Sequence, residues 1–310
     1  MEIVWLLLSL IILYYGAEGL VFGASSFAKR LGISPLVIGL TIVSIGTSMP
    51  ELIVSVKAAL NGQSALSIGN VLGSNMFNIG IILGFSAIIY PLVAKRQLLK
   101  LDVPVMVLTS ILFLLLFLDS EISRLDASLM ALLFLSYTTY LLITSKRSQE
   151  KKTDSDDDIK LTKHWSLDII FFVGGLLALV YGSDLLVVNA TIIAEQLGMS
   201  ESMIGLTIVA AGTSMPELAT SVVAAIKKRS DIAIGNIVGS NTFNILFILG
   251  VTGLIHPIST PEINYMDSLF VVALGGILWL FMKTVSSIKR WHGAIFIFLY
   301  LLYFFIKIMI

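Results

Sequence analysis

The chain lacks cysteine altogether and has few charged residues for its length of 310. Without cysteine, disulfides, thiolate metal sites and cysteine nucleophiles are excluded. Charged residues make up 13% of the chain, whereas soluble domains contain about a quarter. The formal net charge is zero, so no nucleic-acid partner is indicated, and the absence of a glycine-rich phosphate loop argues against nucleotide binding. A membrane protein is therefore the expected class.

Long hydrophobic runs make up most of the chain: 57% of the residues are hydrophobic and the mean hydropathy is +0.96. A helix needs about 20 apolar residues to cross a bilayer core. Suitable runs lie near 3–27, 35–59, 64–90, 102–119, 125–145, 165–194, 202–226, 231–255, 265–283 and 291–309. They are continuous, unlike the alternating strands of an outer-membrane barrel. We predict an all-α membrane protein of ten transmembrane helices, the first of which is retained and not cleaved as a signal.

Basic residues are distributed unevenly between alternate loops, which predicts the orientation in the membrane. Seventeen of the 20 Lys and Arg residues fall in one set of loops, and only Lys57, Arg124 and Lys307 in the other. Because basic loops stay in the cytoplasm, we expect both termini outside and the central linker inside a plasma membrane.

That linker, residues 146–163, separates a first transmembrane unit, 1–145, from a second, 164–310. Its acidic residues Asp154, Asp156, Asp157 and Asp158 invite a calcium-sensor interpretation. The glycine and the final glutamate of an EF-hand loop are missing, and the segment is too short for a folded regulatory domain. We interpret it as a solvated cytoplasmic tether.

The two five-helix units are related by an internal repeat. A shift of 166 positions aligns 38–92 with 204–258 without a gap, and 32 of these 55 positions are identical. Five helices is an odd number, so the second copy must enter the membrane from the opposite side. The sequence thus predicts inverted repeats, with a cargo site at the midplane where interrupted helices of both halves meet.

Two copies of the motif GTSMPE lie within the second and seventh predicted helices, at 46–51 and 212–217. Proline has no amide hydrogen and clashes with the carbonyl four residues earlier, so Pro50 and Pro216 should free the carbonyls of Gly46 and Gly212. Irregular backbone at membrane depth must line a cavity or be buried in protein. We expect broken helices here and also at the third and eighth helices.

Glu51 and Glu217 follow the two prolines directly. An ionised carboxylate at the bilayer centre costs several kcal/mol unless it is paired, and no intramembrane Lys or Arg is available as a partner. Carboxylates, hydroxyls and freed carbonyls form an all-oxygen site, which suits a hard cation such as calcium. A cation-binding site is therefore predicted between the two motifs.

The third and eighth helices carry the repeated sequence GNxxGSNxFN. Ser74 and Asn78 lie four residues apart on one helical face, as do Ser240 and Asn244, so these side chains can direct oxygen toward the glutamates. The glycine spacing alone is more often a packing feature. Asn70, Asn75, Asn236 and Asn241 can equally satisfy freed backbone groups. For Glu18 and its counterpart Asp184, we favour interface placement or helix–helix hydrogen bonding over ion gating.

These paired blocks resemble the alpha repeats of the sodium/calcium exchanger family, within the calcium/cation antiporter superfamily, over nearly the whole chain. The resemblance implies four sites between helices 2, 3, 7 and 8. Calcium would bind the carboxylates of Glu51 and Glu217 and the carbonyls of Thr47 and Thr213. Asn78 and Asn244 would line a middle position. The flanking sodium ligands it implies are Ser48, Ser74 and the Ser44 carbonyl on one side, and Ser214, Ser240 and the Ala210 carbonyl on the other.

The resemblance also implies a mechanism. Some relatives, including potassium-dependent exchangers, carry aspartate at the position of Asn244. Asparagine cannot ionise, so potassium coupling is not expected here and the site keeps a formal charge of two minus. One calcium ion neutralises that charge. The family implies three sodium ions per calcium, and hence electrogenic exchange. Alternating access would follow from helices 1 and 6 sliding past the other eight. No prosthetic group is expected, and the partners are the two ions and the lipid bilayer around a monomer.

Three other functions fit parts of the pattern. A proton/calcium antiporter could use the glutamates as proton carriers, although the serine and carbonyl ligands favour sodium. A cation channel fits less well, since inverted halves and broken helices are typical of a carrier. An intramembrane enzyme would need a nucleophile, catalytic histidine or metal triad, and none accompanies the glutamates.

Overall fold

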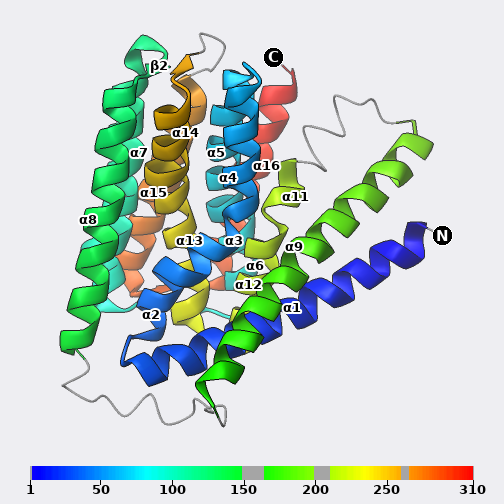
Figure 1. Cartoon of the computed structure of the whole chain (residues 1–310), viewed down its shortest axis with the longest axis vertical. Coiled ribbons are helices and arrows are strands. Elements are labelled where there is room, and N and C mark those ends of the chain that lie inside the picture. Colours follow the sequence, from blue (N-terminus) through cyan, green and yellow to red (C-terminus); the bar gives the residue numbers. More distant parts are fainter. Residues whose placement is uncertain (1, 149–163, 199–209, 260–264, 310) are drawn as a thin grey trace.

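The computed structural model describes residues 2–148, 164–198, 210–259 and 265–309, which form a bundle of helices with two short strand pairs (Figure 1). The predicted linker therefore lies mostly outside the described residues. In the first half the elements are α1 Glu2–Leu31, α2 Pro35–Ile38, η1 Gly39–Val43, α3 Ser44–Thr47, α4 Met49–Leu60, α5 Ser64–Phe77, η2 Asn78–Leu83, α6 Gly84–Ile89, β1 Leu92–Val93, η3 Leu98–Asp102, α7 Val103–Leu116, η4 Phe117–Asp119, β2 Glu121–Ile122 and α8 Arg124–Ser148.

The second half has a similar order of elements. Its elements are α9 Trp165–Gln196, α11 Ala210–Thr213, α12 Met215–Ile226, α13 Ser230–Phe243, η7 Asn244–Ile248, α14 Leu249–Ile255, β3 Ile258–Ser259, α15 Tyr265–Val285, β4 Ser287–Ile288 and α16 Arg290–Met309. Segments η1, η2, η3 and η7 are π-helical, and η4 is a 3₁₀ turn.

Among the described residues, eight helices are long and apolar enough to cross a membrane, or nine if the bent pair Pro35–Thr47 and Met49–Leu60 is one span. The chain is thus a multi-pass membrane protein. The seventh predicted helix, 202–226, is represented by α11 and the 12-residue apolar helix α12, because 202–209 lie outside the described residues.

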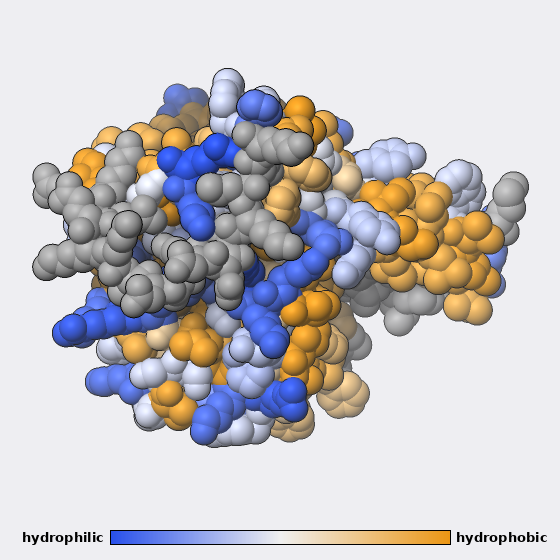
Figure 2. Space-filling model, turned by 90° about the horizontal axis from the view of Figure 1, so that it is seen from below, coloured by the Kyte–Doolittle hydropathy of each residue, from blue (hydrophilic) through white to orange (hydrophobic). Residues whose placement is uncertain are grey.

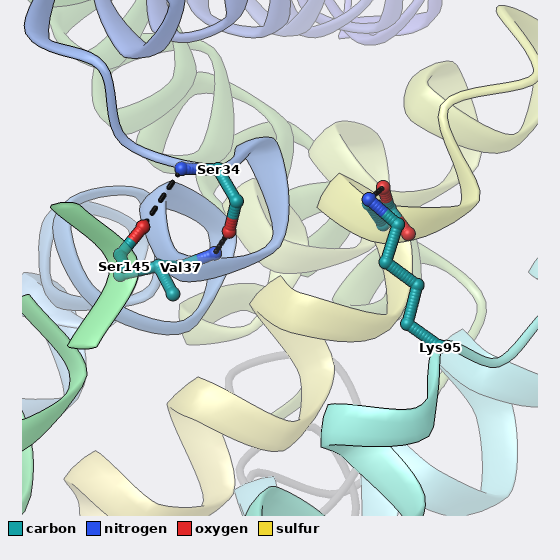
Figure 3. A network of polar contacts seen from close by, with 5 residues as sticks. Ser34, Val37, Lys95 and Ser145 are labelled. Carbon is teal, nitrogen blue, oxygen red and sulfur yellow. Dashed lines mark hydrogen bonds and ion pairs between the residues drawn. The ribbon is translucent and has the colours of Figure 1, made fainter. Parts of the chain in front are cut away.

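The second predicted helix is broken. Its two parts meet at Ser48 with a bend of 47°, as the proline predicted. The helix begins with a cap at Ser34, whose hydroxyl accepts the Val37 N–H at 3.3 Å (Figure 3). The backbone N–H of Ser34 donates to Ser145 Oγ at 2.9 Å. Lys95, in the same view, forms an ion pair with Asp231 at 2.6 Å, which fixes the start of α13.

The prediction of breaks in the third and eighth helices was wrong. Residues Ser64–Ile89 and Ser230–Ile255 each form one continuous span. Each span contains a π-helical segment, starting at Asn78 in one and at Asn244 in the other. The glycines and asparagines in these spans suggested an interruption. Neither span contains a proline, so the helix continues and only widens locally into a π-helical turn.

Two strand pairs link the halves to each other. β1 pairs antiparallel with β4, matching Leu92 to Ile288, and β2 pairs with β3, matching Ile122 to Ile258. A shift of 166 positions converts one pair into the other, so the repeat extends beyond the aligned motifs. The pairs lie at opposite ends of the bundle, since β3 precedes α15 and β4 follows it.

α1 and α9 pack against each other in antiparallel directions and extend away from the bundle as a projecting arm (Figure 1). A Cβ placed at Gly175 would lie 2.5 Å from the Leu20 amide nitrogen, and one at Gly23 would lie 2.7 Å from the Asp168 carbonyl oxygen. Only glycine permits this approach of the two backbones. At one end of the arm, Arg30 pairs with the buried Asp168 at 2.5 Å.

The span Ser230–Ile255 lies at the centre of the bundle: 94% of its most apolar stretch is buried, against 28% for the helix Glu2–Leu31. α13 accordingly contacts the second helix, α7 and α12. Seen from below, hydrophilic residues gather over the bundle, while the projecting arm is mostly hydrophobic (Figure 2). Because α13 carries motif residues of the second half and contacts the second helix, the motif residues of both halves meet in the middle of the molecule.

Candidate cation-binding site

Ser48 and Ser214 occupy the breaks in the two motif helices. Ser48 separates α3 from α4 and Ser214 separates α11 from α12, and the two have nearly the same backbone conformation, with φ −88° and ψ 12° at Ser48 and φ −91° and ψ 8° at Ser214. Pro50 and Pro216 lie in the first turn of the following helices, where proline is tolerated because no intrahelical partner is lost. The breaks thus place a serine from each half in the protein interior.

The freed carbonyl of Gly212 finds a partner on another helix. The Ser183 hydroxyl of α9 donates to it at 2.5 Å. Sequence reasoning missed this contact, because the equivalent of Ser183 in the first half is Ala17 and the repeat therefore gave no signal. It connects the projecting arm directly to the broken helix.

Each glutamate is hydrogen-bonded by a serine of the opposite half. Ser48 Oγ donates to Glu217 Oε1 at 2.7 Å, and Ser214 Oγ donates to Glu51 Oε1 at 3.0 Å. Both glutamates are only 1% exposed, and none of the ion pairs found among the described residues involves them. The second oxygen of each, Oε2, is buried without a hydrogen-bond partner.

The third and eighth helices contribute further oxygen atoms. Ser74 Oγ lies within hydrogen-bond distance of Ser214 Oγ, at 3.2 Å, whereas Ser240 Oγ is buried without a partner. The side-chain oxygens of Asn78 and Asn244 are likewise buried and unpartnered. Asn244 Nδ2 donates to Asn75 Oδ1 at 3.0 Å, so its amide is held with the oxygen facing away from Asn75.

A second layer of amides supports this cluster. Asn70 Nδ2 donates to the Glu51 carbonyl at 3.1 Å and to Ser55 Oγ at 2.9 Å. In the other half, Asn236 Oδ1 accepts the Thr47 hydroxyl at 3.2 Å and its Nδ2 donates to Ser221 at 3.0 Å. Asn75 donates to the Asn241 carbonyl at 3.2 Å, across the centre of the bundle. Asn241 donates to the Ile237 carbonyl at 2.8 Å, within α13. Asn70, Asn75 and Asn241 therefore donate to backbone carbonyls, whereas both contacts of Asn236 are with side chains.

The four carbonyls expected as ligands belong to α3 and α11. Ser44 and Thr47 are fully buried in α3, and the Ser44 carbonyl accepts the Ser48 N–H at 3.0 Å and the Thr47 hydroxyl at 3.4 Å. The Ser44 hydroxyl donates within its own helix, to the carbonyls of Leu40 and Thr41. Thr213 is the last residue of α11, and Ala210 is the first residue of α11 that the structure describes.

The chemistry of the cluster is uniform. Carboxylate, hydroxyl and amide oxygens converge, and the described residues contain no group of three His, Cys, Asp or Glu side chains. Orphaned buried acceptors cost free energy unless a donor or a cation satisfies them. A hard cation with a preference for oxygen fits this set, and two carboxylates set the charge that it would neutralise.

Glu18 and Asp184 differ although the repeat equates them. Glu18 forms an ion pair with Lys227, in the turn between α12 and α13, whereas Asp184 is exposed. The hydrogen bond to Glu18 raises the pKa of the Lys227 amine. The favoured interpretation of Glu18 as a helix-to-helix contact is consistent with this pairing, which attaches α1 to the rest of the bundle.

A buried oxygen cluster at the breaks of membrane helices defines a polytopic ion transporter. The family model described as sodium/calcium exchanger protein matches residues 1–143 and 167–309. The chain belongs to the sodium/calcium exchanger family and is a transporter, not an enzyme.

Relatives match over most of their length. The chain is 36% identical over 279 residues to inner membrane protein YrbG of Escherichia coli, covering 88% of this chain and 86% of that one. It is 34% identical over 332 residues to the sodium/calcium exchanger MaX1 of Methanosarcina acetivorans, covering 95% of both. The solved structure of the sodium-calcium exchanger NCX_Mj, soaked with zero Na⁺ and Ca²⁺, has a TM-score of 0.85 at 32% identity and covers 97% of both chains.

Proposed function

We propose that this protein exchanges sodium for calcium by alternating access. The observation that carries the proposal is the crossed pairing of Glu51 with Ser214 and of Glu217 with Ser48, which leaves one buried oxygen on each carboxylate without a partner. Two such carboxylates in a protein interior repel each other and require positive charge. A transported cation supplies it.

The central position takes calcium. Its ligands are the carboxylates of Glu51 and Glu217 and the carbonyls of Thr47 and Thr213. The flanking positions take sodium at Ser48, Ser74 and the Ser44 carbonyl, and at Ser214, Ser240 and the Ala210 carbonyl. Asn78 and Asn244 line the middle. The buried, unpartnered oxygens of Ser240, Asn78 and Asn244 support this assignment, as does the known calcium preference for six or more oxygen ligands.

The framework is a pair of inverted five-helix repeats, 1–145 and 164–310, with ten transmembrane helices in total. The support comes from elements that the 166-residue shift exchanges. The strand pairs β1–β4 and β2–β3 lie at opposite ends of the bundle, and α1 and α9 are antiparallel. Both termini lie outside a plasma membrane and the linker 146–163 lies in the cytoplasm, because the basic loops gather on that side.

The stoichiometry in this proposal is three sodium ions per calcium ion, as the family resemblance implies. One calcium ion or two sodium ions neutralise Glu51 and Glu217, and a third sodium ion makes the sodium-loaded carrier positive. Exchange of three sodium ions for one calcium ion therefore moves one net charge per cycle. α1 and α9 form the moving part: their glycine-lined contact makes them one unit, and this unit contacts the bundle chiefly through α12.

The test is calcium uptake into proteoliposomes that contain the purified protein and are loaded with sodium. We expect uptake when external sodium is low, and no uptake when sodium is equal on both sides. A protonophore should leave this uptake intact. Uptake that requires a pH gradient, and persists without a sodium gradient, would replace sodium with protons as the coupling ion. Calcium flux without any counter-ion would indicate a channel.

A further inference from the structure

The last helix, α16, is capped at its start by a histidine. His292 is 1% exposed, and its Nδ1 accepts the backbone N–H of Lys289 at 3.0 Å. Lys289 directly precedes the first helical residue, Arg290, so His292 acts from the third helical position and forms one half of a capping box. The ring also stacks on Phe281 of α15, with the two centroids 4.2 Å apart. His292 therefore satisfies a donor that the helix itself leaves without a partner.

The repeat places an aspartate at the equivalent position of the first half. A shift of 166 positions relates Lys289 to Ser123 and His292 to Asp126. Asp126 Oδ2 accepts the Ser123 N–H at 3.0 Å, and the Ser123 hydroxyl accepts the Asp126 N–H at 3.3 Å. An aspartate carboxylate stays ionised down to about pH 4. The cap of α8 is thus insensitive to pH near neutrality, whereas the cap of α16 depends on one imidazole nitrogen.

The ring of His292 can cap the helix only while it is neutral. A ring nitrogen that accepts a hydrogen bond carries no proton, so the single proton lies on Nε2, which is buried without a partner. In the imidazolium form both nitrogens are donors, and Nδ1 would then oppose the Lys289 N–H. The charged ring would also lie at the positive end of the helix dipole.

The charged groups around this cap do not compensate an imidazolium. Those of α15 and α16 at this end are all basic: Lys283, Lys289 and Arg290. The segments η2 and α6, which pack against α16, contain no titratable residue. The acidic residue at the start of α13, Asp231, is already paired with Lys95. Protonation of His292 therefore adds an uncompensated charge and removes the cap.

The first turns of α16 pack against the span that carries Asn78. A Cβ at Gly293 would lie 2.5 Å from the Gly84 carbonyl oxygen, and one at Gly80 would lie 2.6 Å from Tyr300 Cβ. Gly80 belongs to η2, which begins at Asn78. Opening of the first turn of α16 would therefore loosen the support of a π-helical segment in the candidate cation-binding site.

We propose that the cap of α16 is a proton-sensitive switch, in which protonation of His292 releases the Lys289 N–H and opens the first turn of the helix. In the proposed orientation this end faces the cytoplasm. The closed cap requires a neutral ring, whereas a histidine in an opened turn takes up a proton near pH 6.5. The cap therefore stabilises the start of α16 above that pH, and its contribution is lost as the pH falls. Opening can be measured without ion transport, so its outcome is separate from the identity of the coupling ion.

The experiment is hydrogen–deuterium exchange of the purified full-length protein in detergent, followed by mass spectrometry of peptides from the start of α16. After correction for the intrinsic pH dependence of exchange, we expect opening to become about tenfold more favourable between about pH 7.5 and 5.5. His292→Gln keeps a neutral acceptor that does not titrate in this range, so the change should disappear. His292→Asp copies the cap of α8 and should also remove it.

Two controls separate this cap from general effects of acid. His256→Gln removes an exposed histidine whose Nδ1 lies 2.9 Å from the carbonyl of the adjacent Pro257, and should keep the tenfold change. Peptides from the start of α8, which Asp126 caps, should show no such change in the unmodified protein. Opening of α16 that does not respond to pH would overturn the proposal. So would a tenfold change that persists in His292→Gln, or an equal change at the start of α8.

Discussion

At the scale of single residues, the two central glutamates are held by hydrogen bonds from the opposite half of the chain. Ser48 contacts Glu217 and Ser214 contacts Glu51. A serine hydroxyl compensates only part of the cost of a buried charge, and it occupies only one of the two carboxylate oxygens. The other oxygen is directed by the same contact, so the serines both stabilise the carboxylates and orient them for a cation.

Neutralising either glutamate should abolish exchange. Glu51→Gln and Glu217→Gln keep the size of the side chain and an acceptor for serine but remove the charge that attracts calcium. We expect calcium uptake in proteoliposomes to fall by roughly a hundredfold or more, since removing the anionic partner of a buried cation costs about 3–5 kcal/mol. Asp102→Asn, at a buried carboxylate bonded to Tyr137 outside the cluster, is the matched control. Retained exchange in either Gln variant would contradict the proposed site.

A carboxylate at Asn244 should change the dependence on ions and pH more than the stability. Asn244→Asp adds a third negative charge beside Glu51 and Glu217, and neighbouring like charges favour protonation. We expect inhibition by protons to begin at a higher pH than in the unmodified protein, measured as sodium-driven calcium uptake across a pH series. Asn78→Asp tests the equivalent position of the other half. An unchanged pH profile in Asn244→Asp would place this side chain outside the ion-binding region.

At the scale of secondary structure, backbone groups released by the helix breaks are satisfied by neighbouring helices. The Gly212 carbonyl, freed by Pro216, accepts the Ser183 hydroxyl of α9. The first half has alanine at the corresponding position, Ala17. The two breaks are therefore alike in backbone conformation but differ in their connection to the arm.

Ser183→Ala should destabilise the protein through this carbonyl. The variant leaves a buried acceptor without its donor, which costs about 1–3 kcal/mol. Thermal unfolding of the detergent-solubilised protein should show a lower midpoint. Ser25→Ala is the control, because the Ser25 hydroxyl is also buried but donates within its own helix, to Val21. Equal decreases of the unfolding midpoint in Ser183→Ala and Ser25→Ala would mean that the contact between α9 and α11 adds no more stability than a hydrogen bond within one helix.

Neighbouring glycines of α9 should respond differently to alanine. A Cβ at Gly175 would lie 2.5 Å from the backbone of α1, whereas one at Gly174 meets no described atom within 4 Å. Gly175→Ala should therefore separate α1 from α9 and lower the unfolding midpoint. Gly174→Ala should be neutral or stabilising, since alanine favours the helix by about 1 kcal/mol over glycine. A midpoint for Gly175→Ala at or above that of Gly174→Ala would contradict the close packing of the arm.

At the scale of the whole molecule, the two halves are interlocked through their centres and through their ends. Asn75 contacts both Asn241 and Asn244 across the middle, and the strand pairs join linkers of different halves at each end. Such a body resists deformation. The α1–α9 arm, in contrast, projects beyond the bundle (Figure 1), which makes it the part best suited to move.

Calcium uptake should respond to the membrane potential. If three sodium ions leave a proteoliposome for each calcium ion that enters, one net positive charge leaves per cycle. An inside-positive potential should therefore accelerate uptake and an inside-negative potential should slow it. The potential can be set with potassium gradients and valinomycin, and calcium uptake followed at constant sodium gradient. Uptake that is indifferent to the potential would indicate electroneutral exchange of two sodium ions for one calcium ion.

The sequence by itself determined the class of the protein, most of its helices and the residues of its polar cluster. Hydrophobic run lengths fixed the spans because a bilayer imposes a minimum length on a helix. The repeat singled out the same residue types in both halves, and the prolines located the bend in the second helix. Orientation in the membrane and the ion assignments remain predictions.

Only the tertiary structure decided which groups meet. Periodicity describes one helix at a time, so it could not reveal that Ser48 bonds Glu217 and not Glu51, or that Ser183 reaches Gly212. The breaks predicted in the third and eighth helices failed for a related reason. Glycine and asparagine permit interruption but do not force it, and the buried segments that begin at Asn78 and Asn244 are π-helical instead. Local composition limits what a segment can do, and contacts between segments select among those possibilities.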